Sequence, residues 1–308
     1  MTSAHEARAL IPPGWPEWIG RFPPEGGPSG ADWAAGLPRL LGELVDDWGL
    51  TPTGQGMTGW TALVVPVERD GEPLVLKVAW PHHESAGEAL ALRHWNGNGA
   101  VRLVAADPGR AALLLEALDP ARDLEAAEVD VDTACEVIGG LLGRLHVRAP
   151  ARLRTLSGFA AEQVGRLADA RERLPRRAIE RAVHLATDLV LEPDCDSTLL
   201  HTDLHFGNVL AGTREPWLAI DPKPMAGHPG FELQPVLRNR VAELGTGSTF
   251  RHLVRRRLEV VCEAAGIDED AARAWTILSS VIQANWSSLD GEAEQVTLHL
   301  ALAKALED

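Results

Sequence analysis

The chain has 308 residues, 45% hydrophobic residues and a formal net charge of −15. The length suits one large domain or two packed lobes, and the average composition excludes a disordered, collagen-like or disulfide-framework chain. No apolar run approaches the roughly 20 residues that cross a bilayer, and the first residues lack a secretory signal pattern. We therefore expect a cytoplasmic protein without a membrane partner. So acidic a chain has no electrostatic reason to bind nucleic acid.

Two residue types are rare in this chain. The three cysteines are far apart and odd in number, which favours reduced structural thiols over a metal or redox motif; they are Cys135, Cys195 and Cys262. Among 29 basic residues there are only three lysines, namely Lys77, Lys223 and Lys304. Since most basic residues of this chain are arginines, a lysine is more indicative of a specific role here than in an average sequence.

The first 50 residues are expected to form an arm and one helix. Residues 1–30 are rich in proline and glycine, which predicts an irregular segment on the surface. Apolar residues then recur at helical spacing from Leu37 to Trp48, which predicts an amphipathic helix.

Residues 51–118 are expected to form strands with one helix. Apolar runs at 61–67 and 73–79 flank an Asp70-Gly71 pair and predict a β-hairpin. Pro66 lies inside the first run, which implies an edge position or a bulge. A helix and two more short strands complete this region.

The remaining chain is expected to be mostly helical, with one strand-rich island at 198–221. The predicted helices lie near 130–147, 156–191, 249–265, 270–288 and 292–307. Together these patterns predict an α+β fold of two lobes. Residues 1–50 would pack on a β-rich nucleotide-binding lobe at 51–118, and 119–308 would form the helical lobe. A cleft is expected near residue 118.

The densest polar group of the sequence lies in the island at 198–221. It contains His201, Asp203, His205, Asn208 and Asp221. If the turn between the two apolar stretches is centred near Arg214, Asn208 lies opposite Asp221. Directly opposed residues have Cβ atoms roughly 5 Å apart. The two side-chain oxygens would then suit a hard cation such as Mg²⁺, and Asp203 would reach the same place from the preceding loop.

The pattern H-x-D-L-H-x-x-N, followed by a strand ending in Ile-Asp, resembles the catalytic segment of antibiotic phosphotransferases with a protein-kinase-like fold. The segments WLAIDPKP and HPGFELQPVLRNR resemble the streptomycin 6-kinase and hydroxyurea phosphotransferase family in particular. The resemblance covers about residues 30–290. It implies a bilobal kinase that uses ATP and Mg²⁺ to phosphorylate a hydroxyl group of a small molecule.

The resemblance also implies a role for each residue of the island. Asp203 would be the catalytic base, and Asn208 and Asp221 would hold Mg²⁺ on the nucleotide phosphates. His201 would be a structural member of the loop, and His205 would pack or hydrogen-bond beside it. Each of the residues Asp203, Asn208 and Asp221, taken alone, is also compatible with a structural role in a turn.

Three departures from related sequences are informative. Thr202 replaces the arginine that reads a phosphorylated activation loop in protein kinases, and Pro222-Lys223 replaces their Phe-Gly pair. A small-molecule kinase is therefore favoured over a protein kinase. Glu232 lies where antibiotic kinases often carry aspartate, and we expect it to contact the substrate.

Lys77 lies between apolar neighbours in LVLKVAW. A buried ammonium group is costly unless it is paired, and a compact point charge suits the α- and β-phosphates of a nucleotide. Its carboxylate partner is expected from the predicted helix at 82–95. We choose Glu88, with Glu84 as the second candidate. A lysine that extends its ammonium to solvent is the alternative.

The segment GQGMTGW precedes this hairpin and carries Gly54, Gly56 and Gly59. Such a loop suits backbone N–H groups that cover phosphates, and we expect Gly56 to bind the nucleotide; a flexible turn is the alternative. By resemblance, the adenine docks on the backbone of Glu116 to Leu118.

The sequence leaves the substrate open. An acidic surface is compatible with a cationic aminoglycoside, but hydroxyurea is neutral, and a kinase for a metabolite such as an amino sugar is an alternative. A transition-metal oxygenase or hydrolase with His201, Asp203 and either His205 or His228 as ligands is a second alternative, and a non-catalytic binding protein is a third. The sequence gives no oligomeric state.

Overall fold

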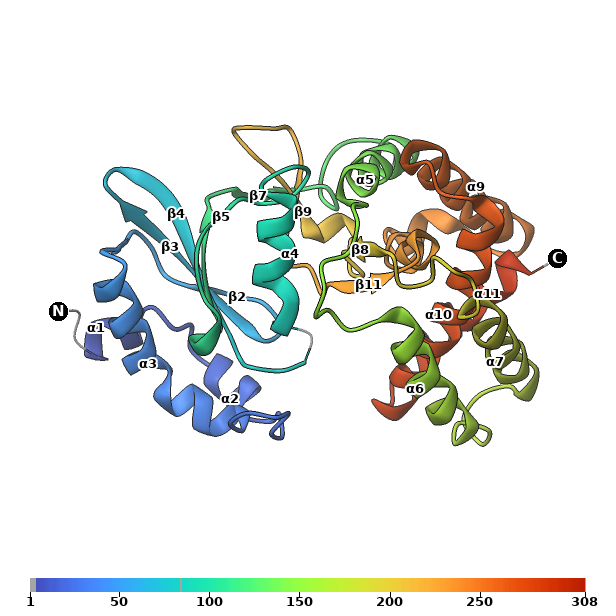
Figure 1. Cartoon of the computed structure of the whole chain (residues 1–308), viewed down its shortest axis with the longest axis horizontal. Coiled ribbons are helices and arrows are strands. Elements are labelled where there is room, and N and C mark those ends of the chain that lie inside the picture. The colour runs from blue at the N-terminus through green and yellow to red at the C-terminus, as the bar shows by residue number, and fades with distance from the viewer. Residues whose placement is uncertain (1–3, 84, 308) are drawn as a thin grey trace. The chain divides into compact units, whose positions relative to one another are not determined.

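The computed structural model describes residues 4–83 and 85–307. The chain divides into two compact units. The first runs through Gly97 and resumes at Val101–Leu118; the second comprises Asn98–Ala100 and the chain from Asp119 onward. The first unit is rich in strands and the second is mainly helical (Figure 1), which confirms the predicted α+β class.

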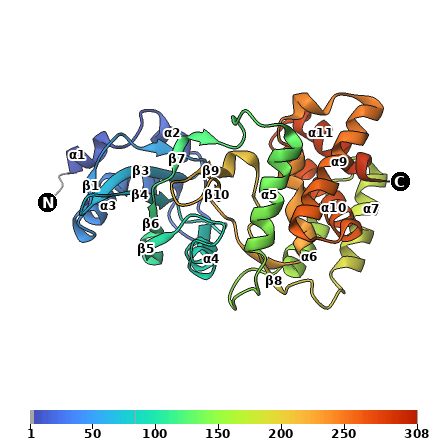
Figure 2. The same ribbon diagram turned by 90° about the horizontal axis from the view of Figure 1, so that it is seen from above.

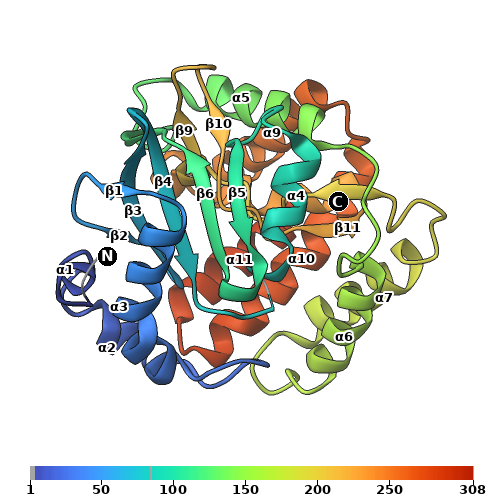
Figure 3. The same cartoon turned by 60° about the vertical axis from the view of Figure 1, so that its left-hand side comes forward.

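In its described residues, the first unit has one antiparallel sheet and four α-helices. Its strands are β1 (Thr51–Pro52), β2 (Met57–Thr58), β3 (Ala62–Arg69), β4 (Glu72–Ala79), β5 (Leu103–Asp107) and β6 (Ala112–Glu116). Its helices are α1 (Ala4–Ala9), α2 (Trp15–Ile19), α3 (Gly30–Asp47) and α4 (Glu88–Trp95). The strand order is β1-β3-β4-β6-β5, and β2 also pairs with β3 (Figure 3).

The predicted hairpin is present, but β3 is not an edge strand. β3 and β4 join at Asp70 and Gly71, which adopt φ values of 54° and 80°. Both β1 and β2 pair with β3, and Pro66 lies between the residues that they contact. The carbonyl of Pro66 accepts a bond from the N–H of Thr53 at 3.0 Å. The N–H and C=O of a strand residue point to the same side. The nitrogen of Pro66, which has no hydrogen to donate, therefore faces the gap between β1 and β2 and not β4.

The irregular surface segment that the proline and glycine content predicts is present at 21–29, which is mainly exposed and lies outside helices and strands, but residues 4–19 differ from the prediction. They form α1 and α2, and the apolar residues Ala7, Ile11, Trp15 and Ile19 are buried in one cluster with residues of α3 and the sheet. These four residues recur at every fourth position, a spacing that is typical of the buried face of helical segments, although turns separate α1 from α2. The segment is therefore part of the core of the first unit.

The second unit is built around long helices. Its helices are α5 (Val131–Leu145), α6 (Leu156–Ala168), α7 (Arg176–Leu189), α8 (Gln234–Leu237), α9 (Gly247–Ala265), α10 (Glu269–Leu289) and α11 (Ala293–Leu306). α10 packs against α11 and α7 (Figure 1), and α5 lies beside α9 (Figure 2). Among the described residues, none of the helices combines the length and apolar character needed to span a bilayer.

Short strands carry the polar island of the second unit. They are β7 (Asp119–Asp123), β8 (Thr198–Leu200), β9 (Val209–Ala211), β10 (Leu218–Ala219) and β11 (Met225–Gly227). β10, β9 and β7 form one small sheet, and β11 pairs with β8 in another. The three cysteines are buried and free, and burial raises the pKa of each thiol to about 12. This confirms the prediction of reduced structural thiols.

The packing of α5 on α9 depends on Gly139. A Cβ atom at this position would lie 2.5 Å from the Cβ of Ala264 and 2.9 Å from the carbonyl oxygen of Val261. We expect Gly139→Ala to lower the free energy of unfolding by about 1–3 kcal/mol, because overpacking forces the two helices apart. Urea denaturation measures this change.

The neighbouring Gly140 provides the matched control. It is exposed on the same helix, and a Cβ atom there meets nothing within 4 Å. Gly140→Ala should leave stability unchanged or raise it by up to about 1 kcal/mol, since alanine is the better helix former. Equal effects of the two substitutions would contradict the close packing at Gly139.

Candidate active site

The loop after β8 is held against the segment that precedes β11. The pairing of β8 with β11 continues beyond the strands, because the N–H of Lys223 donates to the carbonyl of His201 at 3.0 Å. The hydroxyl of Thr202 donates to the carbonyl of Lys223 at 2.6 Å. Thr202 itself has a φ of 61°, a left-handed conformation that turns the chain away from the strand. Asp203 follows directly on this turn.

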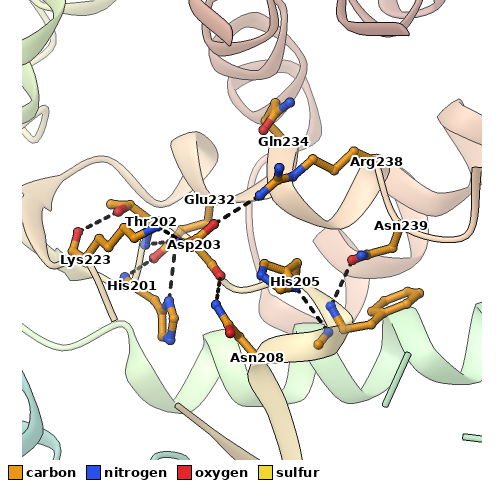
Figure 4. Close-up of polar contacts among 12 residues, drawn as sticks. His201, Thr202, Asp203, His205, Asn208, Lys223, Glu232, Gln234, Arg238 and Asn239 are labelled. Atoms are coloured by element: carbon orange, nitrogen blue, oxygen red, sulfur yellow. Dashed lines mark hydrogen bonds and ion pairs between the residues drawn. The ribbon is translucent and has the colours of Figure 1, made fainter. Parts of the chain in front are cut away.

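Glu232 fixes the same turn from the other side. Its carboxylate is fully buried and accepts hydrogen bonds from the backbone N–H groups of His201 and Thr202, at 2.5 and 2.8 Å (Figure 4). Bonds from N–H groups to an ionised carboxylate are among the stronger hydrogen bonds of proteins. The prediction that Glu232 contacts the substrate is therefore corrected, because this side chain is enclosed and holds the loop.

Asp203 lies between two cations (Figure 4). Lys223 Nζ is 2.7 Å from Oδ2 of Asp203, and a guanidinium nitrogen of Arg238 is 3.2 Å from Oδ1. The Asp203 side chain is 15% exposed, and each of the two cations is 38% exposed. The backbone carbonyl of Asp203 accepts a bond from Nδ2 of Asn208 at 2.9 Å. The carboxylate is thus held in a fixed direction while still open to solvent.

The histidines of the loop serve as neutral backbone partners. Nε2 of His201 lies 3.0 Å from the carbonyl of Ile220, and burial lowers the pKa of this imidazole. Nδ1 of His205 accepts the N–H of Gly207 at 3.1 Å, and burial lowers its pKa as well. Their predicted structural roles agree with these contacts.

The transition-metal alternative finds no support in the described part of the chain. Within it, no group of three or more His, Cys, Asp or Glu side chains is placed to hold a metal ion. His228, the other candidate ligand, accepts the N–H of Gly230 through Nδ1 at 3.0 Å.

Asn208 and Asp221 lie at the end of the hairpin of β9 and β10, but the predicted register was wrong by one residue. Val209 pairs with Ala219, and the N–H of Ile220 donates to the carbonyl of Asn208 at 2.9 Å. Asn208 therefore lies opposite Ile220. Asp221 follows with a φ of 56°, which turns the chain directly after the strand.

The two side chains fit a magnesium ion by their chemistry. The bond from Nδ2 of Asn208 to Asp203 fixes the amide, so that the oxygen Oδ1 is the atom suited to a cation. The carboxylate of Asp221 is a second hard oxygen donor, and Mg²⁺ in phosphate sites is held by one or two such groups together with the substrate phosphates.

Lys77 and Glu88 form a buried ion pair in the first unit. Lys77 Nζ is 2.6 Å from Oε1 of Glu88, and the two side chains are only 9% and 6% exposed. Lys77 lies on β4, and Glu88 opens α4. The predicted helix over 82–95 is shorter than expected, because a 3₁₀ turn at Ser85–Gly87 precedes α4. Glu84, the second candidate, lies outside the described residues.

The glycine-rich segment of the first unit is held by the N-terminal chain. The N–H of Gly56 donates to the carbonyl of Leu10 at 2.9 Å, and a Cβ atom on Gly56 would lie 2.5 Å from that oxygen. Nε1 of Trp18 donates to the carbonyl of Trp60 at 3.1 Å. The amide of Gly56 is therefore used by Leu10 in this conformation, and its predicted contact with phosphate stays a prediction.

The remaining predicted positions stay predictions. Glu116 ends β6, and its carboxylate accepts the N–H of Arg102 at 2.7 Å. Leu118 is the last residue of the first unit. The docking of adenine on this backbone is not tested by these contacts, nor is the convergence of Lys77 with the residues of the second unit around one nucleotide.

Three consecutive residues after α8 were missed by the sequence reasoning. Arg238 bonds Asp203, Asn239 accepts the N–H of Phe206 through Oδ1 at 2.9 Å, and the guanidinium of Arg240 lies 5.4 Å above the ring of Phe206. Lys223 was noted as a rare lysine and as part of the pair that replaces Phe-Gly, but no contact with Asp203 was predicted. The signal for Lys223 was present, because extending the β8–β11 pairing places it beside the start of the loop. No local sequence pattern predicted the contact of Arg238 with Asp203.

Sequence comparison decides the family. The family model for aminoglycoside/hydroxyurea antibiotic resistance kinases matches residues 47–291. The chain belongs to this family of kinases. A hydroxyurea phosphotransferase of Kitasatospora aureofaciens is 45% identical to this kinase over 293 residues, 91% of the chain and 82% of the relative. A streptomycin 6-kinase of Streptomyces glaucescens is 42% identical over 286 residues, 91% and 92% of the two chains.

Solved structures confirm the predicted protein-kinase-like fold of this kinase. A thermostable mutant of an aminoglycoside phosphotransferase, in a ternary complex with ADP and hygromycin B, superimposes with a TM-score of 0.54 at 14% identity, covering 86% of this chain and 96% of that one. A choline kinase from Streptococcus pneumoniae gives a TM-score of 0.58 at 13% identity, covering 87% and 98%. These structures show the fold, and membership of the family makes the chain a phosphotransferase.

The buried pair of Lys77 and Glu88 predicts a large effect of removing one charge. Glu88→Gln should lower the free energy of unfolding by about 3–5 kcal/mol, because the buried ammonium of Lys77 loses the carboxylate that lies 2.6 Å away. The double substitution Lys77→Met and Glu88→Met should cost less than Glu88→Gln alone. Urea denaturation tests both.

An exposed pair in the same unit serves as the control. Glu43 lies 2.8 Å from Arg39 with side chains that are 46% and 85% exposed, so Glu43→Gln should cost less than about 0.5 kcal/mol. If Glu88→Gln were as mild as this control, Lys77 would not depend on Glu88 for its charge compensation.

The role of Glu232 predicts a coupled loss of stability and activity. In Glu232→Gln one carboxylate oxygen becomes an NH₂ group that faces a backbone donor. The free energy of unfolding should fall by about 1.5–3 kcal/mol, and turnover should fall because the loop at Asp203 loosens. Denaturation and ATP consumption measure the two effects. The exposed Glu263 of α9 offers Glu263→Gln as a neutral control, and wild-type behaviour of Glu232→Gln would refute the assignment.

Proposed function

We propose that this kinase transfers the γ-phosphoryl group of ATP to a hydroxyl group of a small antibiotic, with Asp203 positioning the hydroxyl. One observation carries the proposal: the carbonyl of Asp203 is bonded by the amide of Asn208 at 2.9 Å. The residue that orients the acceptor and the residue suited to the metal thereby keep a constant separation. Phosphoryl transfer depends mainly on such positioning and on electrostatic stabilisation.

The acceptor side of the reaction follows from the carboxylate of Asp203. Its partly exposed oxygens accept the hydrogen bond of the incoming hydroxyl and aim the hydroxyl oxygen at the γ-phosphorus. The acceptor oxygen forms the new P–O bond as the bond to the bridging oxygen of ADP breaks. The hydroxyl proton passes to Asp203, and ADP leaves with the bonding electrons. General acid–base catalysis typically contributes about 10²–10⁴-fold to the rate of an enzyme.

The nucleotide side rests on residues of both units. In our proposal Asn208 and Asp221 hold Mg²⁺, which neutralises phosphate charge when it is bound. Lys77, oriented by Glu88, contacts the α- and β-phosphates, and the backbone of Glu116 to Leu118 takes the adenine. The rigid placement of the Lys77 ammonium by a carboxylate at 2.6 Å supports this role.

The acceptors to be tested are those of the relatives. The similar proteins are a hydroxyurea phosphotransferase and streptomycin 6-kinases. The net charge of −15 is compatible with a cationic acceptor such as streptomycin, and it does not disfavour the neutral hydroxyurea. We therefore propose one of these two compounds, or a close analogue, as the acceptor, in preference to an amino sugar metabolite.

The proposal predicts selective loss of turnover in Asp203→Ala. ADP release in the presence of streptomycin, hydroxyurea and amino sugars identifies the acceptor of the wild-type protein. With that acceptor, Asp203→Ala should lower kcat by at least about 100-fold, while the affinity for Mg-ADP stays within about threefold. Isothermal titration and a coupled ADP assay give both values.

Asp169→Ala is the matched control, because Asp169 is an exposed aspartate of the same unit; it should retain full activity. Loss of Mg-ADP binding in Asp203→Ala would show that Asp203 serves the nucleotide and not the acceptor. Phosphorylation of an amino sugar alone would replace the antibiotic by a metabolite as the substrate class.

A further inference from the structure

The segment HPGFELQPVLRNR ends in residues that contact the loop of Asp203 at more than one point. Arg238 bonds the carboxylate of Asp203, whereas Asn239 reaches a later part of the loop. Oδ1 of Asn239 accepts the backbone N–H of Phe206 at 2.9 Å (Figure 4). The proposed reaction uses Asp203 and Asn208 of this loop but gives no role to Asn239.

The backbone of Asn239 is itself held on both sides. Its N–H donates to the carbonyl of Val236 in α8 at 3.1 Å, and its carbonyl accepts a bond from the guanidinium of Arg257. Arg257 lies on α9 and is only 1% exposed. A second nitrogen of the same guanidinium lies 3.3 Å from the carbonyl oxygen of Arg240. A buried side chain of α9 therefore sets the position from which Asn239 reaches the loop.

Phe206 is held at its backbone and at its ring by two consecutive residues. Asn239 bonds its N–H, and the guanidinium of Arg240 lies 5.4 Å from the centre of its fully buried ring. A cation over an aromatic face is attractive, and more so away from solvent. The same guanidinium donates to the backbone carbonyls of Leu124, Ala127 and Val129. The start of the 3₁₀ turn Phe206–Asn208 is thus fixed.

Asn208, the residue suited to the metal, ends this turn. Its N–H donates to the carbonyl of His205 at 2.9 Å, and its Nδ2 donates to the carbonyl of Asp203 at 2.9 Å. Only Gly207 separates it from Phe206. A displacement of the Phe206 backbone therefore changes the direction of the Asn208 amide and of its oxygen Oδ1.

We propose that Asn239 is a positioning residue for the metal-binding amide of Asn208. By holding the N–H of Phe206, it fixes the turn that orients Oδ1 of Asn208 for Mg²⁺. This inference rests on the proposed function, in which Asn208 is a ligand of Mg²⁺. Asn239 itself contacts neither the metal nor the phosphates and transfers no proton. Loss of a hydrogen bond that orients a metal ligand typically lowers metal affinity or activity about 10–100-fold.

The test measures metal affinity and needs no knowledge of the acceptor. Isothermal titration gives the affinity of the full-length protein for ADP at a series of Mg²⁺ concentrations, beginning in EDTA. In Asn239→Ala the midpoint of the rise in ADP affinity should move to about 10–100-fold higher Mg²⁺, while the affinity in EDTA stays within about threefold of wild type. Asn239→Asp keeps an accepting oxygen opposite the Phe206 N–H, and its midpoint should stay within about threefold.

A double substitution separates positioning from the loss of a purely structural bond. In an Asn208→Ala background, Asn239→Ala should move the midpoint by less than about twofold, because residues that act through one another are not additive. Asn239→Leu keeps much of the side-chain volume without an acceptor and should repeat the shift of Asn239→Ala. It replaces the alanine variant if thermal unfolding shows that the latter does not fold.

Asn98→Ala is the matched control. Oδ1 of the exposed Asn98 accepts a bond from Nε of Arg144 at 2.9 Å in the same unit. The substitution removes the same type of bond away from the loop, and the Mg²⁺ midpoint should not change.

Three results would overturn the proposal. An unchanged midpoint in Asn239→Ala and Asn239→Leu, or an equal shift in Asn239→Asp, would show that the accepting oxygen does not govern the metal ligand. A full shift in the Asn208→Ala background would mean that Asn239 does not act through Asn208. A wild-type ADP affinity that does not respond to Mg²⁺ is a different result, because it would reject the metal role of Asn208 in the proposed function.

Discussion

The arrangement of the second unit depends on one buried carboxylate. Glu232 receives two backbone N–H groups from the turn that delivers Asp203. The left-handed backbone conformation of Thr202 is unfavourable for a β-branched residue. The two charge-assisted bonds to Glu232 and the bond from the Thr202 hydroxyl to the carbonyl of Lys223 compensate for that cost. Because Glu232 itself lies in the 3₁₀ segment Pro229–Leu233, which packs on α10, the helical core sets the position of the loop.

The first unit solves a similar problem with an ion pair. A lysine on a buried strand is stable only if a carboxylate meets it, and the first residue of α4 supplies one. The glutamate at the start of a helix also lies near the positive end of the helix dipole. Glu88 therefore has two stabilising neighbours, and its carboxylate fixes the direction of the Lys77 ammonium.

The sequence predicted those parts of the structure that follow from local pattern and from a recognised motif. The hairpin at Asp70, the long helices and the pair of Lys77 with Glu88 all follow from periodicity and from the cost of burying a charge. The position of Glu232 was not predictable in this way, because its two partners lie about thirty positions earlier and are backbone groups. Arg238 was missed for the same reason.

Small errors of register also have a physical origin. The position of a turn predicts strand pairing only to within one residue, and that difference moved the partner of Asn208 from Asp221 to Ile220. The N-terminal helices were not predicted, because the proline and glycine content outweighed the recurrence of apolar residues at every fourth position from Ala7 to Ile19.

The burial of the N-terminal segment separates the folding unit from the family signature. The matched family region begins at residue 47, yet Trp15, Ile19 and Leu37 belong to the same apolar cluster as residues of β4, the strand that carries Lys77. A polypeptide trimmed to the matched region would expose one face of its sheet to water. It would also lack the carbonyl of Leu10, which accepts the N–H of Gly56. In this kinase the boundary of shared sequence is not the boundary of independent stability, and the residues before position 47 are as much a part of the first unit as its strands.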